Sequence, residues 1–126
     1  MKLSDYVFNF LAELGVKHVF GIVGGANAHL ADSLAKHQKI DWICTRNEQA
    51  ASIAAEAYAR ITGNLGVVLV TSGPGGTNAI TGLCCAWMDS IPVIFISGQV
   101  PLLVTTDGKT VRQLGVQQIN IIDGVA

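Results

Sequence analysis

The chain has 126 residues, a length that suits one domain with a single core. Its formal net charge is −1 and its 8 Lys and Arg residues are scattered, so the sequence offers no basic surface for nucleic acid or an anionic membrane. Charged residues make up only 13% of the chain, against roughly 25% in an average soluble domain. We therefore expect another subunit or domain to cover part of the exterior.

The sequence also bounds the cellular location and the use of cysteine. No apolar run is long enough to span a membrane, and Asp5 and Glu13 interrupt the stretch that an amino-terminal signal peptide would need. These features predict a cytoplasmic protein. The cysteines Cys44, Cys84 and Cys85 have neither the even count of a disulfide framework nor the spacing of a zinc site, so we expect them to be small buried hydrophobic residues.

The hydrophobic pattern predicts alternating helices and strands. The first helix covers residues 3–14, and Gly15 ends it. Apolar strands are then expected at 18–23, 40–45, 65–72 and 91–98, with helices at 26–38, 47–61 and 76–90. The strands are continuous apolar runs, which is typical of parallel sheets covered by helices on both faces.

This alternation predicts an α/β fold with a doubly wound, mainly parallel sheet. After Gly98 the pattern weakens, and the chain stops where a further helix and strand would be expected. The fold is therefore expected to be truncated at its C-terminus.

The chemistry is expected in the loops that follow the strands, because open parallel sheets bind ligands beyond the carboxyl ends of their strands. Three of these loops, at 23–27, 72–78 and 98–101, contain glycine, and the fourth, at 46–49, carries Glu48. In the segment TSGPGGTN, Pro74 fixes one backbone angle and the flanking glycines remove side-chain bulk. This pattern favours a backbone ledge against a flat or charged ligand; a tight turn that only leads into the next helix is the alternative.

Glu48 is the candidate reactive group. If Asn47 caps the helix, Glu48 is its first residue, where the helix dipole favours a negative charge by roughly 0.3–1 kcal/mol. Its apolar neighbours and the glycine ledge offer little water, and burial disfavours the ionised form by more than that. We therefore expect a carboxylic acid that stays protonated near neutral pH and exchanges a proton with a ring nitrogen. Arg46 is expected to point outward, and an ordinary first-turn acid is the alternative.

Other sites are less favoured. The GPGG segment after a strand is similar to a dinucleotide fingerprint, but Asn78 stands where the third glycine is needed, so an NAD-binding domain remains a minority alternative. The histidines on the second predicted helix lack a third ligand, and we expect no metal site. Glu56 and Arg60, four residues apart, are expected to form a surface pair.

Four segments together resemble one protein family. They are RNEQAASIAAEAYARITG, GVVLVTSGPGGTNAITGL, AWMDSIPVIFISGQVP and GVQQINII. In this order they resemble the amino-terminal pyrimidine-binding domain of thiamine-diphosphate-dependent enzymes, and the acetolactate synthase group above all. The resemblance implies that residues 1–126 form this domain with the thiamine-diphosphate-binding fold, and that the central and diphosphate-binding domains are absent.

The resemblance also implies roles for individual residues. Glu48 would hydrogen-bond N1′ of the aminopyrimidine ring and promote loss of the proton on C2 of the thiazolium ring. Glu48 would be both catalytic and cofactor-binding, and the residues implied to lie along the ring are Ser72, Gly73, Pro74, Gly75 and Asn78. The residues implied to border the substrate are Gly24, Gly25 and Gln117. The reaction would decarboxylate a 2-keto acid such as pyruvate and join the product to a second carbonyl compound.

Two departures from the family pattern bear on the substrate. Val23 stands where the family usually has proline, and Gln118 and Asn120 stand where acetolactate synthases typically have acidic residues. The resemblance therefore leaves open another 2-keto acid or acyl donor.

The resemblance implies partners as well. Mg²⁺ would be bound by the absent diphosphate domain, FAD is a possible further cofactor of the full-length protein, and the cofactor would lie between two subunits of a homodimer or tetramer. The chain alone is expected to be inactive. A non-catalytic binding or assembly module with the same fold is the alternative.

Overall fold

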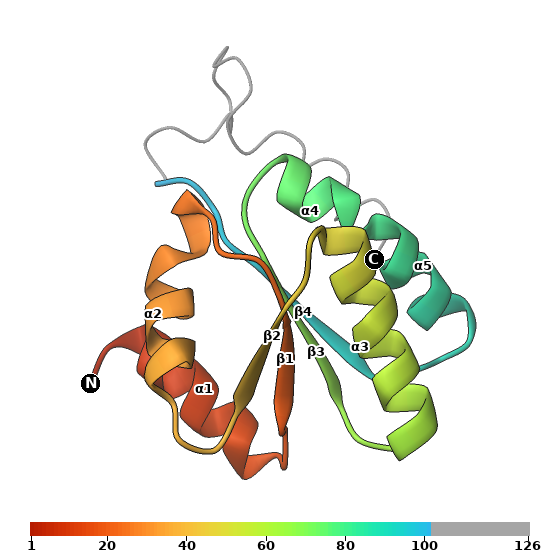
Figure 1. The fold of residues 1–126 in the computed structure, drawn as a ribbon, viewed down its shortest axis with the longest axis horizontal. Coiled ribbons are helices and arrows are strands. Elements are labelled where there is room, and N and C mark those ends of the chain that lie inside the picture. Colours follow the sequence, from red (N-terminus) through yellow and green to blue (C-terminus); the bar gives the residue numbers. More distant parts are fainter. Residues whose placement is uncertain (102–126) are drawn as a thin grey trace.

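The computed structural model describes residues 1–101. In chain order its elements are α1 (Leu3–Glu13), β1 (His18–Gly21), the 3-10 helix η1 (Gly25–Asn27), α2 (Ala28–Lys36), β2 (Asp41–Cys44), α3 (Glu48–Thr62), β3 (Gly66–Val70), α4 (Pro74–Asn78), α5 (Ile80–Met88) and β4 (Val93–Ser97). The strands form one parallel sheet in the order β2-β1-β3-β4 (Figure 1). The α/β fold predicted from the sequence is confirmed.

The helices cover both faces of this sheet. Figure 1 shows α1 and α2 on one side of the strands and α3 and α5 on the other. All of β3 is buried, and its side chains alternate between two cores because successive residues of a strand point to opposite faces. Val67 and Leu69 pack in the core with α1 and α2, whereas Val68 and Val70 pack with Ala51 and other residues of the α3 side.

The ends of two helices are set by local sequence. Gly15 and Gly63, with φ angles of 86° and 69°, follow α1 and α3 in the left-handed conformation that glycine adopts at little cost. Asn47 caps α3, and its Oδ1 accepts a hydrogen bond of 2.7 Å from the backbone N–H of Ala50. Both predicted helix ends and the predicted cap are therefore confirmed.

The prediction of a single helix at 76–90 is wrong in detail. The structure has two helices there, α4 and α5, joined at Ala79. Helix α4 begins two residues earlier than predicted because Pro74 occupies its first turn, where proline has the right φ angle and its missing N–H costs nothing. The glycine ledge expected from the sequence is therefore one short helix that starts directly after Gly73.

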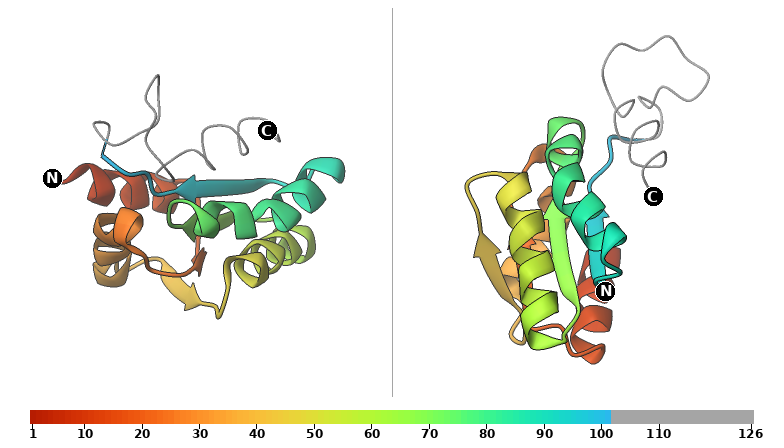
Figure 2. Two further views of the ribbon diagram at one scale, coloured as in Figure 1. Left: turned by 90° about the horizontal axis from the view of Figure 1, so that it is seen from above. Right: turned by 90° about the vertical axis from the view of Figure 1, so that its right-hand side faces the viewer.

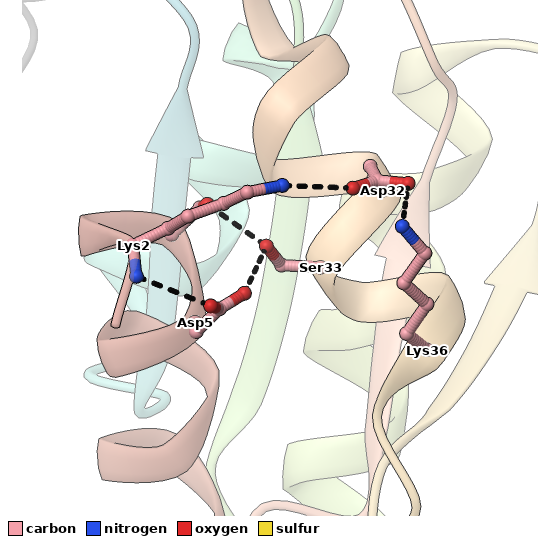
Figure 3. Close-up of polar contacts among 6 residues, drawn as sticks. Lys2, Asp5, Asp32, Ser33 and Lys36 are labelled. Atoms are coloured by element: carbon pink, nitrogen blue, oxygen red, sulfur yellow. Dashed lines mark hydrogen bonds and ion pairs between the residues drawn. The ribbon is translucent and has the colours of Figure 1, made fainter.

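A polar cluster ties α1 to α2 (Figure 3). The Ser33 hydroxyl lies 2.7 Å from Asp5 Oδ1 and 2.8 Å from the hydroxyl of Ser4. Two hydrogen bonds hold the pKa of the Asp5 carboxyl below its ordinary value. The larger effect comes from the Ser33 hydroxyl and the smaller from the backbone N–H of Lys2. Asp32 pairs with Lys36 at 2.6 Å and with Lys2 at 3.3 Å, and these two lysines, Lys36 first, lower its pKa.

Helices α3 and α5 lie side by side (Figure 2), and Arg60 links them. The Arg60 guanidinium donates to the carboxylate of Glu56 on its own helix and to that of Asp89, which follows α5. These two hydrogen bonds raise the pKa of Arg60, and the bond to Asp89 has the larger effect. The predicted surface pair is thus wrong in one respect: Glu56 is only 8% exposed, because α5 packs against this part of α3.

The prediction of buried cysteines is also wrong. Cys44 and Cys85 are exposed and Cys84 is half-buried. Cys44 ends β2, the outermost strand on one side of the sheet, so fewer neighbours cover it.

Several apolar side chains on α3 and α5 are exposed as well, among them Ile53, Ile61, Trp87 and Met88. No helix within residues 1–101 combines the length and apolar character of a membrane span.

Candidate active site

The loops after β1, β3 and β4 meet at the carboxyl edge of the sheet. Thr71, the residue directly after β3, lies at their centre. Its Oγ1 accepts a hydrogen bond of 3.3 Å from the backbone N–H of Ala26 in the first loop. Gly98, after β4, donates its N–H to the carbonyl of Val70 at 2.9 Å and packs against the backbone of Ala26. Three segments far apart in the sequence thus form one compact edge.

Two of the predicted site glycines are required by Thr71. A Cβ atom at Gly24 would lie 2.5 Å from Thr71 Cβ, and one at Gly75 would lie 2.7 Å from Thr71 Cγ2. Both distances are far below van der Waals contact, so neither position has room for a side chain while Thr71 stays in place. The first and third loops therefore both pack on the side chain of Thr71.

The two similar segments GGAN and GGTN use their asparagines differently. Asn27 is 1% exposed, its Oδ1 accepts from the N–H of Gly24 at 2.7 Å, and its Nδ2 donates to the carbonyl of Ile22 at 3.0 Å. Its side chain closes its own loop. Asn78 is exposed and donates instead to Glu48 Oε2 across the site, at 3.1 Å.

Glu48 is positioned by the start of its own helix and by contacts with α4. It is the first residue of α3, directly after the Asn47 cap, so the positive end of the helix dipole lies beside it. Its Oε2 accepts from Asn78, and its Oε1 would lie 3.5 Å from a Cβ atom at Gly75. Glu48 is half-buried, so residues 1–101 alone do not enclose it completely.

A hollow of about 460 Å³ opens next to these loops. Its described walls are Gly25, Ala26, His29, Ser72, Gln99, Val100 and Pro101. Apolar and polar residues from the three loops and from α2 therefore line an open space at the edge where a parallel sheet binds its ligands.

The structure brings most of the predicted site residues together. Glu48, Gly75 and Asn78 are in direct proximity, and Ser72 and Gly25 line the hollow. Gly73 is buried with a φ angle of 63°, which glycine adopts readily, and it directly precedes Pro74 at the start of α4. Gln117 lies outside the described residues, as do Gln118 and Asn120.

Thr71 was missed by sequence reasoning. Its position at the end of a buried apolar strand, just before a glycine-rich segment, was the available signal. That position alone does not reveal that two glycine loops pack on the same side chain. Among residues 1–101, no three His, Cys, Asp or Glu side chains gather in a way that could hold a metal ion.

Comparison of the sequence with known proteins identifies its family. The family model described as thiamine pyrophosphate enzyme, N-terminal TPP binding domain, matches residues 1–123. The chain belongs to this family. Thiamine pyrophosphate is another name for thiamine diphosphate, so the resemblance seen in the sequence is confirmed.

Individual relatives of this thiamine pyrophosphate enzyme domain are acetolactate synthases. The chain is 52% identical over 97 residues to the acetolactate synthase large subunit of Buchnera aphidicola subsp. Schizaphis graminum, covering 77% of this chain and 17% of that protein. It is 53% identical over 97 residues to the acetolactate synthase isozyme 3 large subunit of Escherichia coli K12, again covering 77% and 17%. The large subunit of Lactococcus lactis is 47% identical over 105 residues, covering 82% of this chain and 18% of that protein.

The chain thus spans less than a fifth of the length of these curated relatives. The family match covers the glutamate, both glycine loops and the hollow described above. The site therefore lies within the part of the chain that defines a thiamine pyrophosphate enzyme.

Proposed function

We propose that this chain is the pyrimidine-binding domain of an acetolactate-synthase-type enzyme, and that Glu48 is its catalytic acid. The reaction proposed for the whole protein is decarboxylation of a 2-keto acid such as pyruvate and ligation of the product to a second carbonyl compound. The observation that carries the proposal is the arrangement of Glu48 beside a glycine that leaves one of its carboxyl oxygens open. The relatives named acetolactate synthase support the choice of reaction.

The residues present fit the aminopyrimidine of thiamine diphosphate. A flat ring with nitrogen atoms on its edge needs a carboxyl group for a nitrogen and a surface without side chains for the ring. Glu48 is proposed to supply the first, and the glycine-rich start of α4 beside it is proposed to supply the second. A side chain at position 75 would fill the space next to Glu48 Oε1.

When bound, thiamine diphosphate supplies the nucleophilic carbon that attacks the 2-keto acid. This chain would contribute the proton transfer that prepares it: protonated Glu48 would give its proton to N1′ of the pyrimidine and, as the carboxylate, would take it back in the reverse step. The start of α4, from Gly73 to Gly75, together with Ser72, is proposed to lie along the ring. Gly24 and Gly25 are proposed to border the substrate, next to the hollow that Gly25 and Ser72 line.

Other parts of the assembly would complete the site. Glu48 is half-buried among the described residues, and a second subunit with its diphosphate-binding domain would cover the rest of its side chain. The exposed apolar side chains of α3 and α5 offer a surface for such a partner. We propose that Mg²⁺ is bound by the diphosphate domain, and that this chain alone is inactive. FAD in the full-length protein and a cytoplasmic location stay predictions.

Exchange of the C2 proton of thiamine diphosphate with deuterium tests the proposal. The measurement uses the full-length gene product with bound cofactor, and nuclear magnetic resonance follows the loss of the proton signal. Glu48→Gln keeps the size of the side chain but cannot transfer a proton, so exchange should slow by about 10²–10⁴-fold. Glu13→Gln, on the exposed side of α1, is the matched control and should exchange at the normal rate.

Two results would separate the alternatives. Undiminished exchange in Glu48→Gln refutes the catalytic role of this residue. A full-length protein that binds thiamine diphosphate but neither exchanges the C2 proton nor forms a product from pyruvate or another 2-keto acid is a binding or assembly module instead.

A further inference from the structure

The hydrogen bond between Asn78 and Glu48 joins two elements that are far apart in the chain. Asn78 is the last residue of α4 and Glu48 is the first residue of α3. The Asn78 Nδ2 donates to Glu48 Oε2 at 3.1 Å, while Glu48 Oε1 lies on the side of Gly75. One carboxyl oxygen is therefore held by the protein, and the other faces a position that has no side chain.

Asn78 and Asn27 occupy matching positions in two similar loops but have different partners. Asn27 binds Gly24 and Ile22 on either side of itself and is almost fully buried. Asn78 stands at the matching place in GGTN but is the last residue of the short helix α4, from which its side chain reaches Glu48 on α3. Asparagine thus closes its own loop in GGAN, whereas in GGTN it contacts the carboxyl group of Glu48.

An amide is chemically suited to hold a carboxyl group that must gain and lose a proton. A lysine or arginine at position 78 would favour the ionised carboxylate through its full charge. A second carboxylate there would repel it. The amide N–H fixes the orientation of the group by donating one hydrogen bond, and it adds no net charge beside it.

We propose that Asn78 is a positioning residue, which holds Glu48 Oε2 so that Oε1 stays directed at the ring nitrogen of the thiamine pyrimidine. This inference rests on the proposed function of Glu48. It differs from the direct contact between Asn78 and the ring that the family resemblance implies.

The first test measures exchange of the C2 proton and the dissociation constant of thiamine diphosphate in the full-length gene product. Loss of one hydrogen bond corresponds to roughly a two- to tenfold change, so Asn78→Ala should slow exchange by up to about tenfold. Cofactor affinity should change far less, because Asn78 does not contact the ring in this proposal. Asn78→Gln retains the amide and should recover part of the rate, whereas Asn78→Leu keeps the shape without the donor and should not.

Asn64→Ala is the matched control. It removes another exposed asparagine side chain, beyond the far end of α3, and should leave exchange unchanged. The unfolding temperature of every variant is measured in parallel. If Asn78→Ala does not fold, the comparison of Asn78→Gln with Asn78→Leu decides the question.

The decisive test combines Asn78→Ala with Glu48→Gln. If Asn78 acts through Glu48, Asn78→Ala should add no further slowing to that of Glu48→Gln, because the group that Asn78 positions has already been removed. Slowing that multiplies in the double variant, or a large loss of cofactor affinity in Asn78→Ala, shows a direct contact with the cofactor and overturns the inference. Normal exchange in Glu48→Gln refutes the proposed function itself, which is a separate outcome.

Discussion

Ser52 on α3 fills the position that a side chain on Gly82 of α5 would need. A Cβ atom at Gly82 would lie 2.3 Å from Ser52 Oγ and 2.5 Å from Ser52 Cβ. Ser52 is fully buried, and its hydroxyl donates to the carbonyl of Gln49 at 2.9 Å. The close approach of these two helices therefore depends on the missing side chain at position 82.

Replacement of this glycine should loosen the α3–α5 contact. Gly82→Ala is expected to lower the free energy of unfolding by about 1–3 kcal/mol, the usual cost of adding atoms to a packed interior. The better helix propensity of alanine offsets at most about 1 kcal/mol of this. Chemical denaturation of the full-length gene product measures the change. Gly25→Ala, where a Cβ atom meets nothing within 4 Å, is the control and should be nearly neutral.

A substitution at Thr71 should rescue a substitution at Gly75. A Cβ atom at Gly75 would lie 2.7 Å from Thr71 Cγ2, so Gly75→Ala should lower the unfolding temperature and weaken thiamine diphosphate binding. Thr71→Ser removes Cγ2 but retains the hydroxyl that accepts from Ala26, and the double variant should regain stability. The same Thr71→Ser change should not rescue Gly24→Ala, which also meets Thr71 Cβ and Oγ1. Equal rescue of both would contradict this geometry.

The Arg60 contacts predict a non-additive pair of substitutions. Arg60→Met leaves the carboxylate of Glu56, only 8% exposed, without its cation, and should lower the unfolding temperature clearly. Arg60→Met combined with Glu56→Met removes both charges and should unfold at a higher temperature than the single variant. Thermal unfolding of both proteins checks this order. A double variant that is less stable than Arg60→Met would contradict this expectation, because it would show that Glu56 stabilises the fold without Arg60.

The α1–α2 cluster predicts a dependence of stability on pH. The pKa of Asp5 is lowered in the folded protein by Ser33 and Lys2, so its ionised form favours folding above the ordinary pKa near 3.8. This contribution is lost as the pH falls through the lower folded pKa. Asp5→Asn should therefore unfold at a lower temperature than the parent at pH 6, and the difference should shrink as the pH falls below 3.8. A difference that is constant between pH 6 and pH 2 would contradict this assignment.

Much of the fold could be predicted because its signals are local. Gly15, Gly63 and Asn47 act on the residues next to them, so their effect on the helix ends can be read from a few positions. The fully buried β3 is a continuous apolar run for the same reason. The order of the strands is not local, and this is why the exposure of Cys44 on an outer strand was not foreseen.

The candidate site divides in the same way. Glu48 and the glycine loops could be predicted from their places after strands and before helices. The contact between Asn78 and Glu48 spans thirty positions in the chain, and Thr71 contacts residues in both glycine loops. The burial of Glu56 likewise depends on the packing of α5. Such contacts follow from tertiary packing, which no short segment of sequence encodes.

The position of Thr71 has a mechanical consequence. One side chain fills the gaps left by Gly24 and Gly75, so a shift of either loop displaces the support of the other. The loop with Gly24, proposed to border the substrate, and the start of α4, proposed to contact the cofactor, are therefore expected to shift together. A displacement of the loop after β1 is therefore expected to reach the start of α4, beside Glu48, through this single threonine.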